Sequence, residues 1–169
     1  WEYFEYTGDV AFMEEYIYPM LKEEAKFYDA TLIEDNEGKL VSAPSYSPEH
    51  GPRTAGNTYE QSLVWQLYED AITAAQILGV DEDLVEIWSS NQANLKGPIE
   101  IGESGQIKEW YTETTLNKDA NGNNLSGEGY NHRHISHMLG LFPGDLVQQN
   151  PEWIAAAKVS MDNRTDNST

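Results

Sequence analysis

Apolar side chains recur at helical spacing after Gly8 and Asp9, and this pattern predicts the first long helix of the chain. Asp9 can accept hydrogen bonds from the free amides of the first helical turn. Pro19 lies inside the run, and we expect a kink there because proline cannot donate a hydrogen bond to the preceding turn. The residues predicted to form the buried face are Val10, Met13, Ile17, Met20, Leu21 and Phe27.

A turn with the sequence D-N-E-G at residues 35–38 separates two short stretches, T-L-I-E and K-L-V-S, and predicts a small β-hairpin. A long second helix follows the loop after this hairpin. Thr58 and Gln61 match a capping box at its start, and Gly79 is expected to end it. The predicted buried stripe of this helix is Leu63, Leu67, Ala71, Ala75 and Leu78.

Two more helices and a less regular segment complete the pattern. A third helix is expected to begin near Asp81 and to carry Trp88 on its apolar face. The triplet Asn150-Pro151-Glu152 combines a capping residue, a proline at the first helical position and an acid in the first turn, which predicts the last helix. Residues 105–113 could form a short strand. The predicted fold class is therefore mainly α, with long structured loops of the kind that often carry function.

The composition limits the classes of partner. The chain has 169 residues, enough for one domain, and its net charge of −19 excludes binding to nucleic acid through phosphates. A neutral sugar suits such an acidic protein better than a phosphorylated substrate. The absence of cysteine excludes disulfides and thiolate chemistry, and no apolar run approaches membrane-spanning length, so we expect no membrane partner. Both ends look cut, and we expect a piece of a longer protein.

The loop S-A-P-S-Y-S-P-E at residues 42–49 ends in a carboxylate. Its two prolines stiffen the segment, so that Glu49 can point at a fixed target. A carboxyl held in a rigid, partly apolar loop would have a raised pKa, as a general acid needs. On spacing alone, a solvated surface charge is the commoner interpretation of such a glutamate, even with His50 and Arg53 nearby.

The stretch N-H-R-H-I-S-H at residues 131–137 allows several interpretations. His132, His134 and His137 could form a metal site, since imidazole ligands suit zinc. Against a metal, Arg133 would add a positive charge, and no carboxylate stands at ligand spacing within the stretch. A helix start whose polar groups satisfy one another is the purely structural alternative. Hydrogen bonding to a polyhydroxylated ligand is the better functional interpretation, because arginine and histidine supply fixed donors.

Two weaker patterns also concern ligands. Trp110 in E-W-Y could stack on a sugar ring, although burial is at least as common for such a residue, and Trp65 fits the core. Residues 119–130 begin like a calcium-binding loop, but Asn124 stands where glycine is needed and Tyr130 where glutamate is needed. A plain loop is the better interpretation of that segment.

Five stretches, taken in order, resemble glycoside hydrolase family 95. They are W-E-Y-F-E-Y-T-G-D, Y-P-M-L-K-E-E-A-K-F, L-V-S-A-P-S-Y-S-P-E, G-Q-I-K-E-W and H-R-H-I-S-H-M-L-G-L-F-P-G. That family contains α-L-fucosidases, notably those cleaving α-1,2-linked fucose, and some α-L-galactosidases. The resemblance implies that residues 1–169 are a single fragment of an (α/α)6-barrel catalytic domain, truncated at both ends, which packs against the remainder of that domain.

The resemblance also implies roles for individual residues. Glu49 falls where the family places the general acid of an inverting mechanism that uses no metal or cofactor. His132, Arg133 and His134 match the family stretch that binds the sugar, and Trp110 matches an E-W element near the pocket. The family's water-handling asparagines lie upstream and an assisting aspartate lies downstream, both outside this chain. The fragment alone is therefore expected to be inactive.

Three functions remain open from the sequence. The leading one is a fucosidase-type hydrolase acting on a fucosylated oligosaccharide or glycan, with an α-L-galactosidase of the same family as its alternative. A non-catalytic sugar-binding or scaffold domain comes second, and a metal-dependent hydrolase that uses the three histidines comes last. Two departures from the family pattern, His50 in place of asparagine and Glu60 in place of aspartate, leave the hydrogen bonds around Glu49 open.

Overall fold

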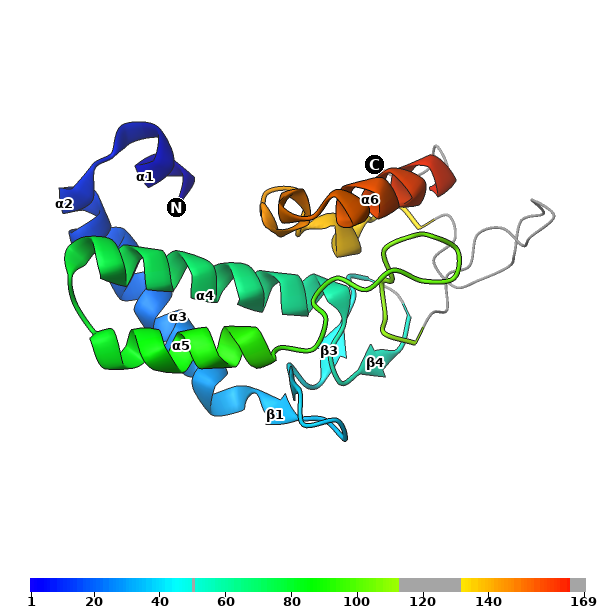
Figure 1. Ribbon diagram of the computed structural model, residues 1–169, viewed down its shortest axis with the longest axis horizontal. Helices are drawn as coiled ribbons and strands as arrows, with labels where there is room; N and C mark the ends of the chain where they lie inside the picture. Colours follow the sequence, from blue (N-terminus) through cyan, green and yellow to red (C-terminus); the bar gives the residue numbers. More distant parts are fainter. Residues whose placement is uncertain (50, 113–131, 165–169) are drawn as a thin grey trace.

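The computed structural model describes residues 1–49, 51–112 and 132–164, and this part of the chain is mainly helical (Figure 1). The helical elements are α1 (Glu2–Thr7), α2 (Val10–Phe12), the π-helical turn η1 (Met13–Ile17), α3 (Tyr18–Thr31), α4 (Thr58–Leu78), α5 (Glu82–Asn94), the 3-10 turns η2 (Ser136–Met138) and η3 (Leu146–Gln149), and α6 (Pro151–Asn163). Two short antiparallel sheets pair β1 (Ile33–Glu34) with β2 (Leu40–Val41) and β3 (Ser45–Tyr46) with β4 (Arg53–Thr54). The predicted mainly α class and the hairpin are confirmed. Among the described helices, none is long and apolar enough to cross a membrane.

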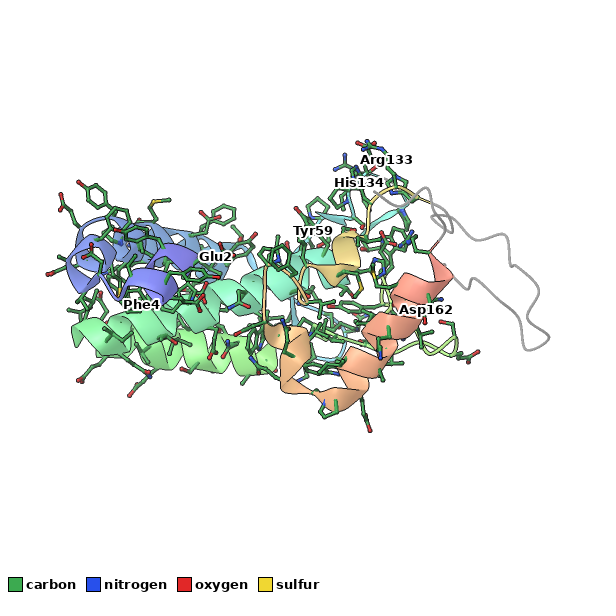
Figure 2. All side chains as sticks on the ribbon, turned by 90° about the horizontal axis from the view of Figure 1, so that it is seen from above. Glu2, Phe4, Tyr59, Arg133, His134 and Asp162 are labelled. Carbon is green, nitrogen blue, oxygen red and sulfur yellow. The ribbon has the colours of Figure 1, made fainter. Side chains whose placement is uncertain are left out.

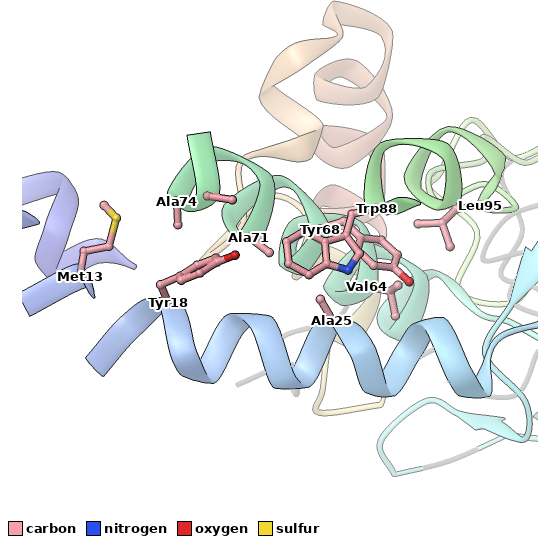
Figure 3. Packing of buried hydrophobic residues seen from close by; sticks show 10 residues of the cluster. Met13, Tyr18, Ala25, Val64, Tyr68, Ala71, Ala74, Trp88 and Leu95 are labelled. Carbon is pink, nitrogen blue, oxygen red and sulfur yellow. The ribbon is translucent and has the colours of Figure 1, made fainter. Parts of the chain in front are cut away.

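Two clusters of buried apolar side chains hold the helices together. The first lies between α3, α4 and α5, where Tyr68 and Trp88 fill the centre (Figure 3). The second joins α6 to the 3-10 turns and includes Met138 and Val147. Figure 1 shows α3, α4 and α5 side by side, with α6 over the β3–β4 half of α4. Trp65, which the sequence places in the core, packs against both clusters.

The N-terminal helical run is interrupted ahead of Pro19, where the sequence predicts a kink. The Tyr18 amide donates to the Met13 carbonyl five residues back, which closes the π-helical turn η1. Asp9 caps α2 as expected, since its carboxylate accepts a hydrogen bond from the Phe12 amide. The predicted buried face is wrong in part, because the extra residue of a π turn changes the direction in which later side chains point. Met13 is buried, but Met20 is 74% exposed.

The start of α4 differs from the predicted capping box. Asn57 is the N-cap, and its side chain accepts a hydrogen bond of 2.9 Å from the Glu60 amide. The Thr58 hydroxyl instead donates to the Lys108 carbonyl. The Gln61 side chain bonds to Leu40, Lys96 and the Ser42 amide, so it ties the helix to the hairpin. Both predicted box residues are used for long-range contacts, which explains why their local pairing is absent.

The sequence also predicts the buried stripe of α4 and its end at Gly79. Gly79 ends the helix in the left-handed conformation with φ 67°, as expected. Leu63 faces outward and lines a pocket, so the predicted stripe is wrong at that position. The buried residues of α4 are Thr58, Gln61, Ser62, Val64, Tyr68, Ala71, Ala74 and Ala75.

The last two helices begin where the sequence places them. Trp88 of α5 is buried, as predicted. Asp81 precedes α5 but does not cap it, because its carboxylate accepts from the Tyr18 hydroxyl at 2.6 Å and from Lys22. The Asn150 side chain accepts from the first turn of α6, which confirms that start signal.

The strand predicted at residues 105–113 is wrong within the described part, which reaches residue 112. Only an isolated bridge, Ile101 with Ile107, occurs there. The Ile107 amide donates to the Ser160 hydroxyl of α6 at 2.9 Å, so this amide is not available to a strand ladder.

Candidate functional site

The segment that carries Glu49 connects β3 to β4 beside the start of α4. Glu60, in the first turn of α4, accepts hydrogen bonds from the Ser42 and Ser45 hydroxyls at 2.7 and 2.6 Å and from the Tyr46 amide at 3.1 Å. Charge-assisted bonds of this kind are among the stronger ones in proteins. A single carboxylate therefore holds the segment that leads to Glu49.

Trp110 lies beneath this segment, and its indole is fully buried. Gly51 has φ +76° and approaches the indole so closely that a Cβ at this position would lie 2.2 Å from Trp110 Cζ2. The interpretation of Trp110 as an open platform for a sugar ring is therefore wrong for this arrangement, and burial, its alternative, is found. Trp110 supports the Glu49 segment through the close contact of its indole with Gly51.

Arg133 pairs with Glu49, although 84 positions separate them in the chain. Arg133 Nη2 donates to Glu49 Oε1, and the two side chains are 54% and 56% exposed. The hydrogen bond from Arg133, followed by its positive charge, lowers the pKa of Glu49 below its ordinary value. The raised pKa expected from an apolar loop is therefore wrong for the unliganded protein, because the sequence does not reveal that Arg133 is the neighbour.

His132 and His134 flank Arg133 at the same place. Their ring centroids are 5.3 Å apart, and the His134 amide donates to His132 Nδ1 at 3.2 Å. Figure 2 shows Arg133, His134 and Tyr59 along one edge of the molecule. Four predicted residues, Glu49, His132, Arg133 and His134, are thus brought together, and Tyr59, which the sequence did not single out, lies beside them.

His137 lies apart from the other two histidines. It is buried, with Nδ1 3.7 Å from Glu109 Oε2. Among residues 1–49, 51–112 and 132–164, no group of three His, Cys, Asp or Glu side chains could hold a metal ion. The calcium-like pattern at 119–130 and His50 lie outside the described residues.

A pocket of about 290 Å³ opens beside this cluster. Its lining consists of Pro48, Tyr59, His134, Ile135, Ser136 and Leu139. Apolar walls with a few fixed polar groups are typical of small-ligand sites, and a sugar ring needs both kinds of contact. Pro48 directly precedes Glu49, so the lining of a pocket that can hold a ring comes within one residue of the proposed acid.

A larger pocket of about 540 Å³ lies along α4, between α1 and the turn at residues 139–145. It is lined in part by acidic side chains, and burial raises the pKa of Asp70 to about 6. None of the residues that the sequence singled out as catalytic or binding candidates lines it. The smaller pocket is therefore the better candidate site.

Sequence reasoning missed a buried polar group behind this pocket. Glu109 accepts a hydrogen bond from the Ser47 hydroxyl at 2.6 Å and a longer one, 3.3 Å, from the Ser136 hydroxyl. These partners are 62 and 27 positions away from Glu109 in the chain. The only local signal is that Glu109 precedes Trp110 in the E-W element.

Comparison with known proteins identifies the family of the chain. The family model described as the glycosyl hydrolase family 95 catalytic domain matches residues 1–169. The chain is 33% identical over 155 residues to "Probable alpha-fucosidase A" of Aspergillus niger (strain ATCC MYA-4892 / CBS 513.88 / FGSC A1513), covering 87% of this chain and 18% of that protein. It is 30% identical over 176 residues to "Alpha-L-fucosidase 2" of Arabidopsis thaliana, covering 97% and 20%.

These relatives are much longer than the chain, which spans only 18% and 20% of their lengths. A third relative, "Probable alpha-fucosidase A" of Aspergillus oryzae (strain ATCC 42149 / RIB 40), is 38% identical over 118 residues, covering 69% of this chain and 15% of that protein. The family match over the whole chain and the identities to these relatives lead to one conclusion. The chain belongs to glycosyl hydrolase family 95 and lies within that family's catalytic domain.

Proposed function

We propose that the chain is part of an (α/α)6-barrel α-L-fucosidase domain that releases terminal α-L-fucose, with α-1,2-linked fucose as the preferred substrate. Glu49 is the general acid of an inverting hydrolysis. The observation that carries this proposal is the pairing of Glu49 with Arg133, each of which directly neighbours a residue, Pro48 or His134, that lines a ring-sized pocket. The names of the curated relatives, which are α-fucosidases, support the substrate class.

The acid step requires a protonated Glu49 that donates to the glycosidic oxygen as the bond to the sugar breaks. In the unliganded protein Arg133 favours the ionised carboxylate. A bound sugar offers hydroxyl oxygens to the same guanidinium, and where Arg133 turns toward the sugar its hydrogen bond to Glu49 weakens. The ring also excludes water from the carboxyl, and both effects raise its pKa at the moment when the proton is needed.

The opposite face of the sugar needs a base that activates water. In inverting glycosidases the two catalytic groups stand roughly 6.5–9.5 Å apart to admit that water. The family resemblance assigns this role to residues outside the 169 positions. This chain therefore supplies the acid, the neighbouring sugar contacts of His132, Arg133 and His134, and one wall of the pocket.

The lining of the pocket favours L-fucose over L-galactose. Pro48, Ile135 and Leu139 present apolar surface. Fucose carries a methyl group where galactose carries a hydroxymethyl group, and burying that extra hydroxyl against apolar walls without a partner is unfavourable. The α-L-galactosidase alternative would require that a polar group of the lining, Tyr59, His134 or Ser136, or another part of the domain bonds to that hydroxyl.

The test is release of free L-fucose from 2′-fucosyllactose by the full-length enzyme and its Glu49→Gln variant. Glutamine has the same shape but cannot donate the proton, so we expect kcat/KM to fall by about 100-fold or more while the fold is kept. Glu14→Gln, at an exposed position on η1, is the matched control and is expected to match the wild type.

Three results would contradict the proposal. Wild-type activity in a folded Glu49→Gln variant would remove Glu49 as the acid. Binding of the trisaccharide without any release, by the wild type as well, would favour a non-catalytic sugar-binding domain. Release from α-L-galactosides alone would replace the proposed α-L-fucosidase by an α-L-galactosidase of the same family.

A further inference from the structure

Glu109 is a carboxylate with a side chain only 1% exposed, located behind the candidate pocket. Burying such a charge is costly unless several groups compensate it. The Ser47 hydroxyl lies 2.6 Å and the Ser136 hydroxyl 3.3 Å from Glu109 Oε1, and each has one proton to donate either to this oxygen or to the other serine. On the other side, His137 Nδ1 lies 3.7 Å and Arg164 Nη2 3.5 Å from Glu109 Oε2.

These partners come from three separate segments of the chain. Ser47 stands two residues before Glu49, and Ser136 stands two residues after His134. Their hydroxyls also contact each other directly. Arg164, at the end of α6, is buried against the same carboxylate, with a side chain 7% exposed. Glu109 is thus the common partner of the Glu49 segment, the H-R-H segment and α6.

The two serine contacts reach the two sides of the candidate pocket. Pro48 on one side follows Ser47 directly, and Ser136 itself lines the other side. Ser47 and Ser136 contact the same Glu109 oxygen as well as each other, so Glu109 completes the contacts that fix the spacing between the two sides. General acids are sensitive to such spacing, because a misplacement of about 1 Å can cost about 100-fold in rate.

We propose that Glu109 is a positioning residue for the acid step, acting through Ser47 on Glu49 and through Ser136 on Arg133 and His134. This inference rests on the proposed function. Glu109 itself touches no substrate in this scheme. It holds the acid and the sugar-binding segment in register, so its loss should impair proton donation more than the remaining steps.

The first experiment compares two substrates with the full-length enzyme and its Glu109→Gln variant. 2′-Fucosyllactose has a poor leaving group and needs the acid, whereas nitrophenyl α-L-fucoside has a leaving group that departs with little help. We expect kcat on 2′-fucosyllactose to fall by about 10- to 100-fold and kcat on the nitrophenyl substrate to change by less than about threefold. Glu100→Gln is the control, because Glu100 lies in the same segment but pairs with Lys108.

The second experiment measures amide hydrogen exchange and does not depend on activity. In Glu109→Gln, exchange should become faster in residues 45–49 and in residues 134–138 together, while Glu100→Gln leaves both unchanged. Ser47→Ala and Ser136→Ala each remove one serine contact of Glu109 and keep the carboxylate. They replace Glu109→Gln as test variants if that variant does not fold. We expect each of them to reproduce the selective loss on 2′-fucosyllactose.

Equal losses on the two substrates, or exchange that changes in neither segment, would overturn the positioning role. The wild type and Glu49→Gln are measured in the same assay. If Glu49→Gln keeps its activity, the proposed acid fails, and the exchange data still decide whether Glu109 couples the two segments. If Glu49→Gln is inactive and Glu109→Gln behaves like Glu100→Gln, the proposed function stands and this inference is wrong.

Discussion

Arg133 determines when Glu49 holds its proton. The guanidinium lowers the pKa of the carboxyl in the free protein, so Glu49 loses its proton at a lower pH than an ordinary glutamate. The stabilisation from this pair is present above the unfolded pKa of Glu49 and is lost as the pH falls through its lowered folded pKa. Because both side chains are more than half exposed, the pair contributes little to folding, and it matters mainly for the proposed acid step.

The Arg133→Gln variant should separate these effects in a pH profile. The alkaline limb of kcat/KM reports the acid in the free enzyme, and removing the positive charge raises the pKa of Glu49. We therefore expect this limb to move to higher pH, together with an increase in KM because a sugar contact is lost. The measurement is kcat/KM for 2′-fucosyllactose across pH.

Arg53→Gln is the control for this profile. Arg53 lies in β4, just after the segment that carries Glu49. Its guanidinium lies over the Tyr46 ring, 5.4 Å from the centroid. Its loss should leave the limb in place. A limb that stays fixed in Arg133→Gln as well would show that the ion pair does not control the proposed acid.

The residues of the site differ in how much the sequence reveals about them. Glu49 could be singled out because prolines and serines in its own loop mark a stiff segment, and the family resemblance then supplied a role. Glu109 could not, because its partners Ser47 and Ser136 are distant in the chain and only folding brings them together. The same reason explains the pKa of Glu49, which depends on Arg133.

At the scale of elements, Asp29 joins three helices through one carboxylate. From α3 it accepts hydrogen bonds from the Tyr68 hydroxyl of α4 at 2.9 Å and from Trp88 Nε1 of α5 at 3.0 Å. Asn91 of α5 adds a third bond at 2.9 Å. Burial, followed by the Asp29 charge, raises the pKa of Tyr68. Tyr68 and Trp88 are buried, so without Asp29 their polar atoms would lose this partner inside the core.

We expect Asp29→Ala to lower the free energy of unfolding by about 3 kcal/mol, because buried donors to a charged acceptor are left without it. Thermal and denaturant unfolding of the full-length enzyme measure this change. Glu23→Ala on the same helix removes an exposed pair with Lys26 and should cost less than about 0.5 kcal/mol. Equal effects of the two substitutions would show that the Asp29 bonds add nothing to the packing of α3, α4 and α5.

Element boundaries could be predicted where the chemistry is local. Asn150 caps α6 and Gly79 ends α4, and each needs only its immediate neighbours. The predicted Thr58 capping box failed because Asn57 provides the cap and Thr58 bonds to residue 108. The buried face after Met13 could not be predicted, because no sequence pattern predicts the π-helical turn. This turn changes the direction in which the later side chains point.

At the scale of the whole molecule, the described chain carries large apolar side chains on its surface. Tyr6, Met20 and Phe142 are 89%, 74% and 77% exposed. Exposed apolar surface of this kind often marks contact with another part of a protein. This agrees with the proposal that the chain packs within a larger catalytic domain. The relatives are several times longer than the chain.

The 169 residues by themselves are expected to give no steady-state release of fucose. The proposed mechanism needs a base and further sugar contacts, and the family resemblance assigns them to segments outside this chain. The measurement is fucose release from 2′-fucosyllactose by the isolated chain, with the full-length enzyme at equal molarity as the positive control. A turnover rate comparable to that of the full-length enzyme would contradict the division of the catalytic groups.

The contacts of Glu109 also have a consequence for the order in which the protein assembles during synthesis. The ribosome makes Ser47 first, Glu109 follows 62 positions later, and Ser136 follows 89 positions after Ser47. Local pairs such as α4 with α5 can form as soon as they emerge, whereas distant contacts must wait for their partners. The Glu49 segment therefore leaves the ribosome long before its anchor exists. We expect a nascent chain that stops before residue 109 to contain helices, while the segment that carries the proposed acid Glu49 is not yet held in place.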